Sequence, residues 1–256
     1  MARIFISFDT DSTFNEDYKD RPKSFTFKNQ DFVLSAAFEI GQQHKICLLA
    51  DADDLTNYGS IREILSSLSW KERMSVREIS SGAHGQESTP CLVDEAMCGP
   101  LSPGRAIGHM YIDGLFEYEN ETQAIALALY RQARNAWWAN FPLYTYLSFF
   151  KIVELAAGGA GEKQLKNLIK QKVESGILHH KSQFVELTKS PGLGVRKDAN
   201  LINSFYSHRQ DCAHALRGSR TFNPDGYPFY RGLVLHIPLL EEMAENVMIN
   251  DLNIPR

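Results

Sequence analysis

The pattern of apolar and polar positions changes near residue 118 of this 256-residue chain. Before that point, short segments rich in β-branched and aromatic residues alternate with turn signals, which is typical of strands. The expected strands are Ile4–Phe8, Ser24–Phe27, Phe32–Phe38 and Lys45–Leu49, with one further strand within Gly108–Tyr118. Apolar residues recur at helical spacing within Ser60–Leu68 and predict a helix there. The stretch Ser80–Arg105 is rich in Gly, Pro and Ser and is expected to be a loop.

From Glu121 onward the apolar positions follow a helical repeat. Asn120 can cap the first helix, Pro142 suits the first turn of the second, and Gly158-Gly159 ends that helix. The expected helices are Glu121–Asn140, Pro142–Ala157, Gly161–Glu174, Lys197–Leu216 and Gly232–Ile249, with Pro238 either kinking the last helix or marking its start. The chain is therefore predicted to be an α+β protein. It would have a small β-rich or α+β domain at 1–118 and a bundle of about five helices at 119–256.

Composition and charge exclude several classes of protein. The net charge of −4 provides no overall positive field, so any contact with nucleic acid must come from a local patch. The four cysteines lack the spacing of a zinc site and are expected to be free, partly buried thiols in a reducing compartment. No signal peptide and no membrane-spanning run is recognised, so a cytoplasmic protein without membrane contact is expected.

One segment, FYSHRQDCAHALRG at residues 205–218, carries the strongest candidate chemistry. Arg209 is followed by four residues and then His214, near the end of a predicted helix. Upstream, the aromatic-rich helix LYTYLSFFKIVELA contains Glu154 near its end. Together these features resemble the HEPN superfamily over about residues 120–250. The run YRQARNAWWANFPLYTYLSFFKIVEL, followed later by the Arg/His helix, is more specifically similar to MauJ-type proteins, named for methylamine-utilisation loci.

The resemblance to HEPN proteins implies metal-independent RNA cleavage at a homodimer interface, without a cofactor, in a stress, toxin or defence setting. His214 would be the acid/base, and Arg209 would stabilise the phosphate. The residues expected to support this pair are Glu154, Gln210 and Asp211, and those expected to bind RNA are Arg217, Arg134 and Arg131. Gln210 stands where many catalytic members have Asn, Asp or His directly after the Arg.

Helix geometry adds an alternative for Arg209. Five residues turn a helix through about 140°, so Arg209 and His214 do not share a face. Arg209 instead falls on the apolar stripe of its helix, and Glu154 continues the apolar stripe of its own. We therefore expect these two side chains to pair between packed helices. The pair could be purely structural, with His214 capping the last turn, in a non-catalytic HEPN-like or MauJ-like scaffold or sensor.

Three weaker candidates remain. The acidic residues Asp9, Asp11, Asp51, Asp53 and Asp54 could bind a cation, although acidic turns that only cap helices or meet water are commoner. Arg131 and Arg134 with Trp137 and Trp138 could stack and hold RNA, but core tryptophans beside a solvated basic face are the commoner arrangement. Ser204 and Ser207 lie near His208 in the sequence, without the signature of a nucleophile elbow.

Overall fold

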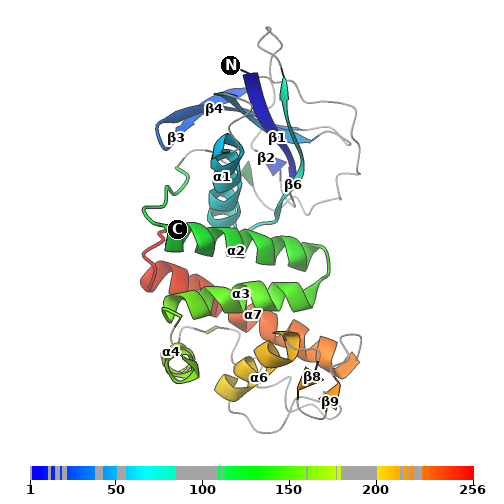
Figure 1. The fold of residues 1–256 in the computed structure, drawn as a ribbon, viewed down its shortest axis with the longest axis vertical. Coiled ribbons are helices and arrows are strands. Elements are labelled where there is room, and N and C mark those ends of the chain that lie inside the picture. Colours follow the sequence, from blue (N-terminus) through cyan, green and yellow to red (C-terminus); the bar gives the residue numbers. More distant parts are fainter. Residues whose placement is uncertain are drawn as a thin grey trace. The chain divides into compact units, whose positions relative to one another are not determined.

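The computed structural model has two compact units (Figure 1), one formed by Met1–Glu119 with Arg256 and one formed by Asn120–Pro255. Each unit is described by itself. The residues that the structure describes are 2–10, 13–14, 18, 22–37, 43–50, 56–84, 109–110, 112, 114–159, 161–176, 178–179, 201–213, 216–217, 220–221 and 227–256. The predicted α+β class is confirmed, since an antiparallel sheet is followed by a helical region.

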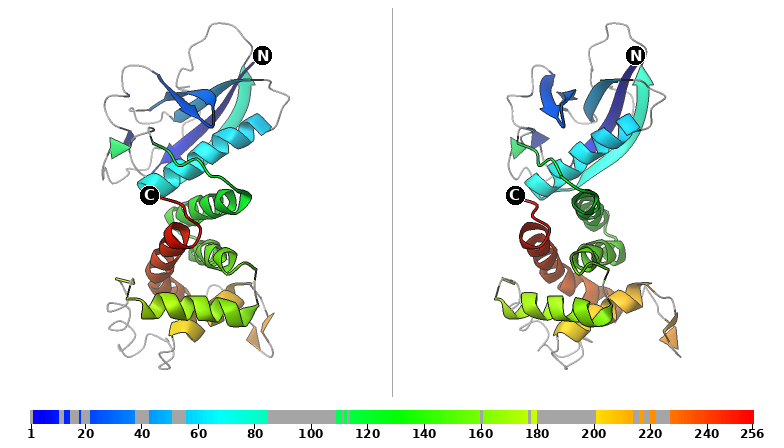
Figure 2. Two further views of the ribbon diagram at one scale, coloured as in Figure 1. Left: turned by 90° about the vertical axis from the view of Figure 1, so that its left-hand side faces the viewer. Right: turned by 60° about the vertical axis from the view of Figure 1, so that its left-hand side comes forward.

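The first unit is built on a five-stranded antiparallel sheet in the order β3-β4-β5-β1-β6. Its strands are β1 (Ala2–Thr10), β3 (Lys23–Phe27), β4 (Gln30–Ser35), β5 (His44–Ala50) and β6 (Val76–His84). A separate short parallel pair joins β2 (Thr13–Phe14) to β7 (His109–Met110). The single helix described here, α1 (Thr56–Glu72), covers one face of the sheet, as the two views of Figure 2 show.

The core of this unit lies between the sheet and α1. Alternate residues of the central strands point towards the helix, as the two-residue period of a strand requires. The buried apolar residues from these strands are Ile4, Ile6, Phe8, Ile46 and Leu48, and those from α1 are Ile61, Ile64, Leu65 and Leu68. The helical stripe predicted from the sequence is therefore confirmed as the buried face of α1.

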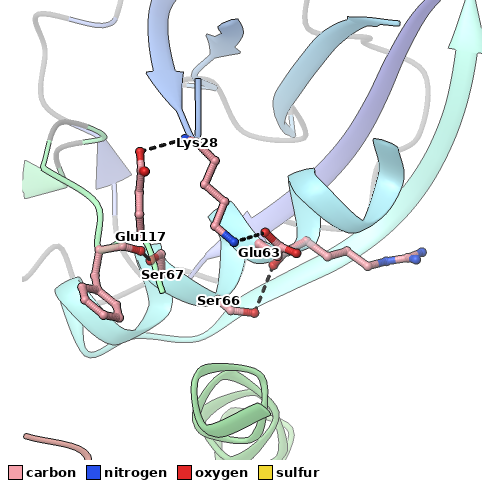
Figure 3. Close-up of polar contacts among 7 residues, drawn as sticks. Lys28, Glu63, Ser66, Ser67 and Glu117 are labelled. Carbon is pink, nitrogen blue, oxygen red and sulfur yellow. Dashed lines mark hydrogen bonds and ion pairs between the residues drawn. The ribbon is translucent and has the colours of Figure 1, made fainter. Parts of the chain in front are cut away.

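Side chains fasten the segment 115–118 against α1 and the β3–β4 turn (Figure 3). The carboxylate of Glu117 accepts a hydrogen bond from the backbone N–H of Lys28 at 2.7 Å, and the Lys28 ammonium pairs with Glu63 at 3.1 Å. The hydroxyl of Ser67 donates to the carbonyl of Phe116. Residues 115–118 are held by these side-chain bonds and are not in a strand. A strand is present within 108–118 as expected, but among the described residues it is limited to His109–Met110 of β7, and residues 112 and 114–118 are not part of it.

Two further expectations for this unit need correction. Strand β6 was not predicted, and the expected loop at 80–105 begins inside it; its sequence VREISSGAH has few strand-forming residues, and pairing with β1 supplies its stability. Cys47, which is 3% exposed, is joined in a disulfide rather than being a free thiol. Since disulfides are typical of oxidising environments, the cysteines no longer support a reducing compartment.

The second unit consists of helices arranged around α3. Its helices are α2 (Glu121–Trp138), α3 (Pro142–Ala156), α4 (Glu162–Glu174), α6 (Leu201–Ala213) and α7 (Tyr227–Asn250), with a short hairpin formed by β8 (Leu216–Arg217) and β9 (Arg220–Thr221). Helix α3 packs most extensively against α2 and α7 and also contacts α4 and α6 (Figure 1). None of the helices that the structure describes is both long enough and apolar enough to cross a membrane.

The signals that begin and end α2 and α3 work as predicted. The Asn120 side chain accepts a hydrogen bond from the Gln123 N–H at 3.0 Å, and Pro142 occupies the first turn of α3. Gly158 and Gly159, with φ of 69° and 66°, end α3 in a backbone region that favours glycine.

The predicted limits of the last two helices are wrong. Helix α6 ends at Ala213 and the β8–β9 hairpin follows, whereas the sequence suggested a helix to residue 216. Helix α7 begins at Tyr227, five residues before the expected start, so Pro238 lies inside it and does not mark its beginning.

Candidate functional site

The candidate site lies on α6, a helix that buries little of its own surface. Of its thirteen residues, only Phe205 is fully buried. The backbone carbonyl of Phe205 accepts a hydrogen bond of 2.7 Å from the hydroxyl of Tyr146, which projects from α3. Burial raises the pKa of Tyr146 well above its ordinary value, so this phenol stays protonated and keeps donating. The contact anchors the middle of α6 to the central helix.

Arg209 and Glu154 pair between α6 and α3, as the sequence predicts. The Nε and Nη2 atoms of Arg209 lie 2.9 and 2.8 Å from the same carboxylate oxygen of Glu154. Glu154 stands in the last turn of α3, where the helix dipole disfavours a negative charge, and the guanidinium offsets that cost. The two side chains are 28% and 29% exposed, so the pair is only partly buried and solvent reaches it.

The other predicted supporting residues do not join this pair directly. The Gln210 side-chain amide donates to the Tyr206 hydroxyl at 2.9 Å, one turn earlier on the same helix. Asp211 is half-buried beside Cys212. Burial, and secondly the charge of Asp211, raises the pKa of the Cys212 thiol to about 12, so this cysteine is a poor nucleophile.

Two of the basic residues expected to bind RNA, Arg131 and Arg134, lie on α2 and not on α6 with Arg209. Arg134, on α2, pairs with Glu241 of α7 at 2.7 Å, with both side chains 20% exposed. Arg131 is half-buried. Trp137 is 39% exposed and Trp138 is half-buried, so the first of these tryptophans is not part of the core. In this part of α2, therefore, Trp137 is exposed and Arg134 is already paired. This differs from the commoner arrangement, in which the tryptophans lie in the core and the basic residues face solvent.

Several candidates fall outside what the structure describes. His214 lies between α6 and β8 and is not among the described residues, and neither is the side chain of Arg217. Asp11, Asp51, Asp53 and Asp54 are also outside them, so the candidate cation site is untested. Within the described part of the chain, no group of three or more His, Cys, Asp and Glu side chains is arranged to hold a metal ion.

Sequence reasoning missed a polar cluster on the other side of α6. The Ser204 hydroxyl lies 2.7 Å from Nε2 of His236 on α7, and the rings of His208 and His236 are 4.3 Å apart. The i, i+4 spacing of Ser204 and His208 places them on one face of α6 and could have indicated half of this cluster. His236 gave no signal, because it stands in an apolar run of α7.

A double-mutant cycle on Arg209→Ala and Glu154→Ala should measure the strength of the pair. Because both side chains are partly screened by solvent, we expect a coupling free energy of about 1 kcal/mol from urea unfolding. The matched control is the more exposed pair Glu162–Lys166 on α4, for which we expect less than about 0.5 kcal/mol. Equal coupling in the two pairs would contradict a specific role for Arg209–Glu154 in joining α3 and α6.

Part of the helical unit matches the model of a known protein family. Residues 126–248, just under half of the chain, match the model of the family described as Methylamine utilization protein MauJ. No curated protein and no solved structure matches the chain. The expected likeness to MauJ-type proteins is thus confirmed, while the likeness to HEPN proteins stays a prediction. The helical unit, from within α2 to within α7, is MauJ-like.

Proposed function

We propose that the helical unit is a HEPN-like, metal-independent endoribonuclease module that uses Arg209 and His214. The observation that carries the proposal is the state of Arg209, which is held by Glu154 and yet 28% exposed. A guanidinium has five N–H donors, and two of them suffice for the contacts to Glu154. The remaining three have no acceptor among the described residues, and planar donors of this kind suit the oxygens of a phosphate.

The proposed chemistry follows from the properties of the two side chains. A histidine with a pKa near neutrality can remove the proton from a ribose 2′-hydroxyl or protonate the leaving oxygen. Planar arginine donors can stabilise the charge that develops on the phosphate oxygens. Glu154 would orient the guanidinium without neutralising its outward face. The same proposal includes a homodimer in which two Arg/His pairs converge. It also includes a cytoplasmic location.

Cleavage of a labelled single-stranded RNA by the full chain, in the presence of a chelator, tests this function. We expect cleavage by the wild type and a loss of roughly a hundredfold or more in both His214→Ala and Arg209→Ala. His179→Ala is the matched control, because His179 is exposed in a turn after α4, and it should cleave like the wild type. Undiminished cleavage by His214→Ala, or none by the wild type, would overturn the assignment.

A second candidate is a non-catalytic, MauJ-like scaffold, and the family match over residues 126–248 favours it. In that case the Arg209–Glu154 pair only fixes the register of α6 on α3. The two candidates differ in what Arg209→Lys does. A scaffold tolerates the lysine if the ion pair persists, whereas the nuclease loses the planar, forked donors that a phosphate requires.

A further inference from the structure

Helix α6 depends on directional polar contacts for its orientation. A helix is usually held by an apolar stripe, but α6 has only one fully buried side chain, Phe205. Its contacts to α3 include the Tyr146–Phe205 hydrogen bond and the Arg209–Glu154 pair. Helix α4 also packs against α6, with the Lys166 ammonium over the Tyr206 ring. A single buried ring resists rotation poorly, so polar contacts, including those on the α7 side, restrain how far α6 is turned about its axis.

On that side, His236 links Ser204 to the backbone of α7. The Nδ1 atom of His236 lies 2.7 Å from the carbonyl oxygen of Gly232, which can only accept, so Nδ1 carries the proton. In the neutral ring Nε2 is then an acceptor, and the Ser204 hydroxyl donates to it at 2.7 Å. This bond has a fixed direction, because the carbonyl of Gly232 sets the tautomer.

His208 completes the cluster. Its Nδ1 lies 2.8 Å from the Ser204 carbonyl, and its ring packs on that of His236. Gly232 makes this close packing possible, since a Cβ at that position would lie only 3.0 Å from Nε2 of His208. The cluster of Ser204, His208, Gly232 and His236 therefore interlocks side chains and backbone of α6 and α7.

The Ser204–His236 contact resembles a nucleophile and its general base, but two observations oppose that role. His236 is 0% exposed, which leaves no room for a substrate beside its ring. Burial, together with the neighbouring His208, lowers the pKa of His236 to about 3, far below the range of an effective base at neutral pH. The contact is better suited to holding a helix than to activating a serine.

We propose that the Ser204–His236 hydrogen bond is a positioning device that sets the rotation of α6 and thereby holds Arg209 on Glu154. Ser204 and Arg209 are five residues apart, about 140° around the helix, so the contacts to α7 and α3 bracket α6 from two sides. A turn of about 20° moves a side chain lying 5–6 Å from the axis by roughly 2 Å, enough to break the hydrogen bond from Arg209 to Glu154. For catalysis, this role rests on the proposed function.

The test is the solvent exchange of the Arg209 Nε–H proton, followed by nuclear magnetic resonance in the full chain. Ser204→Ala is expected to accelerate this exchange about fivefold or more, because a bond worth about 1 kcal/mol no longer restrains α6. Ser204→Thr, which keeps the hydroxyl, should restore slow exchange. The matched control is Asn203→Ala, at the exposed neighbouring position on α6, and it should leave the exchange unchanged.

Unchanged exchange in Ser204→Ala, or equal acceleration in Asn203→Ala, would overturn the proposal. If Ser204→Ala does not fold, the imidazole nitrogen resonances of the wild type decide instead: a protonated Nε2 and bare Nδ1 on His236 would contradict the assigned hydrogen bond. If the exchange responds as expected but the wild type cleaves no RNA, the positioning role stands and the nuclease proposal fails. If the wild type cleaves RNA, Ser204→Ala should lower kcat on the order of tenfold with little change in KM.

Discussion

Acidification from pH 7 to pH 4 is expected to destabilise the helical unit by about 3 kcal/mol through His236 alone. Burial, with a contribution from His208, lowers the pKa of this histidine to about 3 in the folded chain, against 6.5 as its ordinary value. Between these two values the unfolded chain binds a proton that the folded chain does not. The stability from the neutral ring is therefore fully present above about pH 6.5 and is lost progressively as the pH falls towards 3.

Urea unfolding of the wild type and His236→Gln at the two pH values, followed by far-ultraviolet circular dichroism, measures this effect. The glutamine keeps a polar group at this position but does not titrate, so the variant should be less stable at pH 7 and lose less stability on acidification. His179→Gln, at an exposed position, should respond to acid like the wild type. Parallel losses in the wild type and His236→Gln would show that other groups cause the acid sensitivity.

A second buried histidine gives the sheet unit its own acid sensitivity. His44 accepts a hydrogen bond from the Ala37 N–H through Nδ1 at 2.9 Å, and its Nε2 faces the Thr10 hydroxyl at 3.3 Å. Its tautomer is thus the opposite of that in His236, but burial again lowers the pKa to about 3. Because both units respond to acid in the same pH range, the effect of His236 is obtained from the difference between wild type and variant.

The parts of the fold that depend on local chemistry could be predicted from the sequence. The buried stripe of α1, the Asn120 cap and the glycines after α3 each rest on residues within a few positions of one another. The Arg209–Glu154 pair was also predicted, although its members are 55 residues apart. Each of the two helices carries one charged residue within its apolar stripe, and the two charges have opposite signs. When the stripes pack against each other, pairing the two charges avoids leaving either of them unpaired in the contact.

The parts that were missed depend on partners distant in the sequence. Strand β6 is polar and glycine-containing, and only the neighbouring β1 makes it a strand. Gly232 suggested the start of a helix, whereas its lack of a side chain serves the close packing of His208 inside the contact between α6 and α7. The exposure of Arg209 could not be predicted either, because a periodic pattern gives the direction of a side chain but not the surface that surrounds it.

Phe149→Ala on the central helix α3 is expected to lower the free energy of unfolding of the helical unit by about 3–5 kcal/mol. Phe149 is 1% exposed, and its ring meets that of Tyr130 edge to face at 5.8 Å. The Tyr130 hydroxyl in turn donates to Glu245, a carboxylate that is 5% exposed, at 3.0 Å. The alanine would therefore leave a cavity and also loosen Tyr130, whose hydroxyl donates to the buried carboxyl group of Glu245.

Tyr144→Ala is the matched control, since Tyr144 stands on the same helix, is aromatic and is 60% exposed; its loss should cost less than about 1 kcal/mol. If Phe149→Ala is too unstable to purify, Phe149→Leu should show a smaller loss of about 1–1.5 kcal/mol in the same urea experiment. A Phe149→Ala variant as stable as Tyr144→Ala would mean that α3 is not the helix around which the unit is built. In that case Glu154 would not stand on a firmly packed helix, and the orientation of Arg209 would depend on the contacts of α6 with α4 and α7.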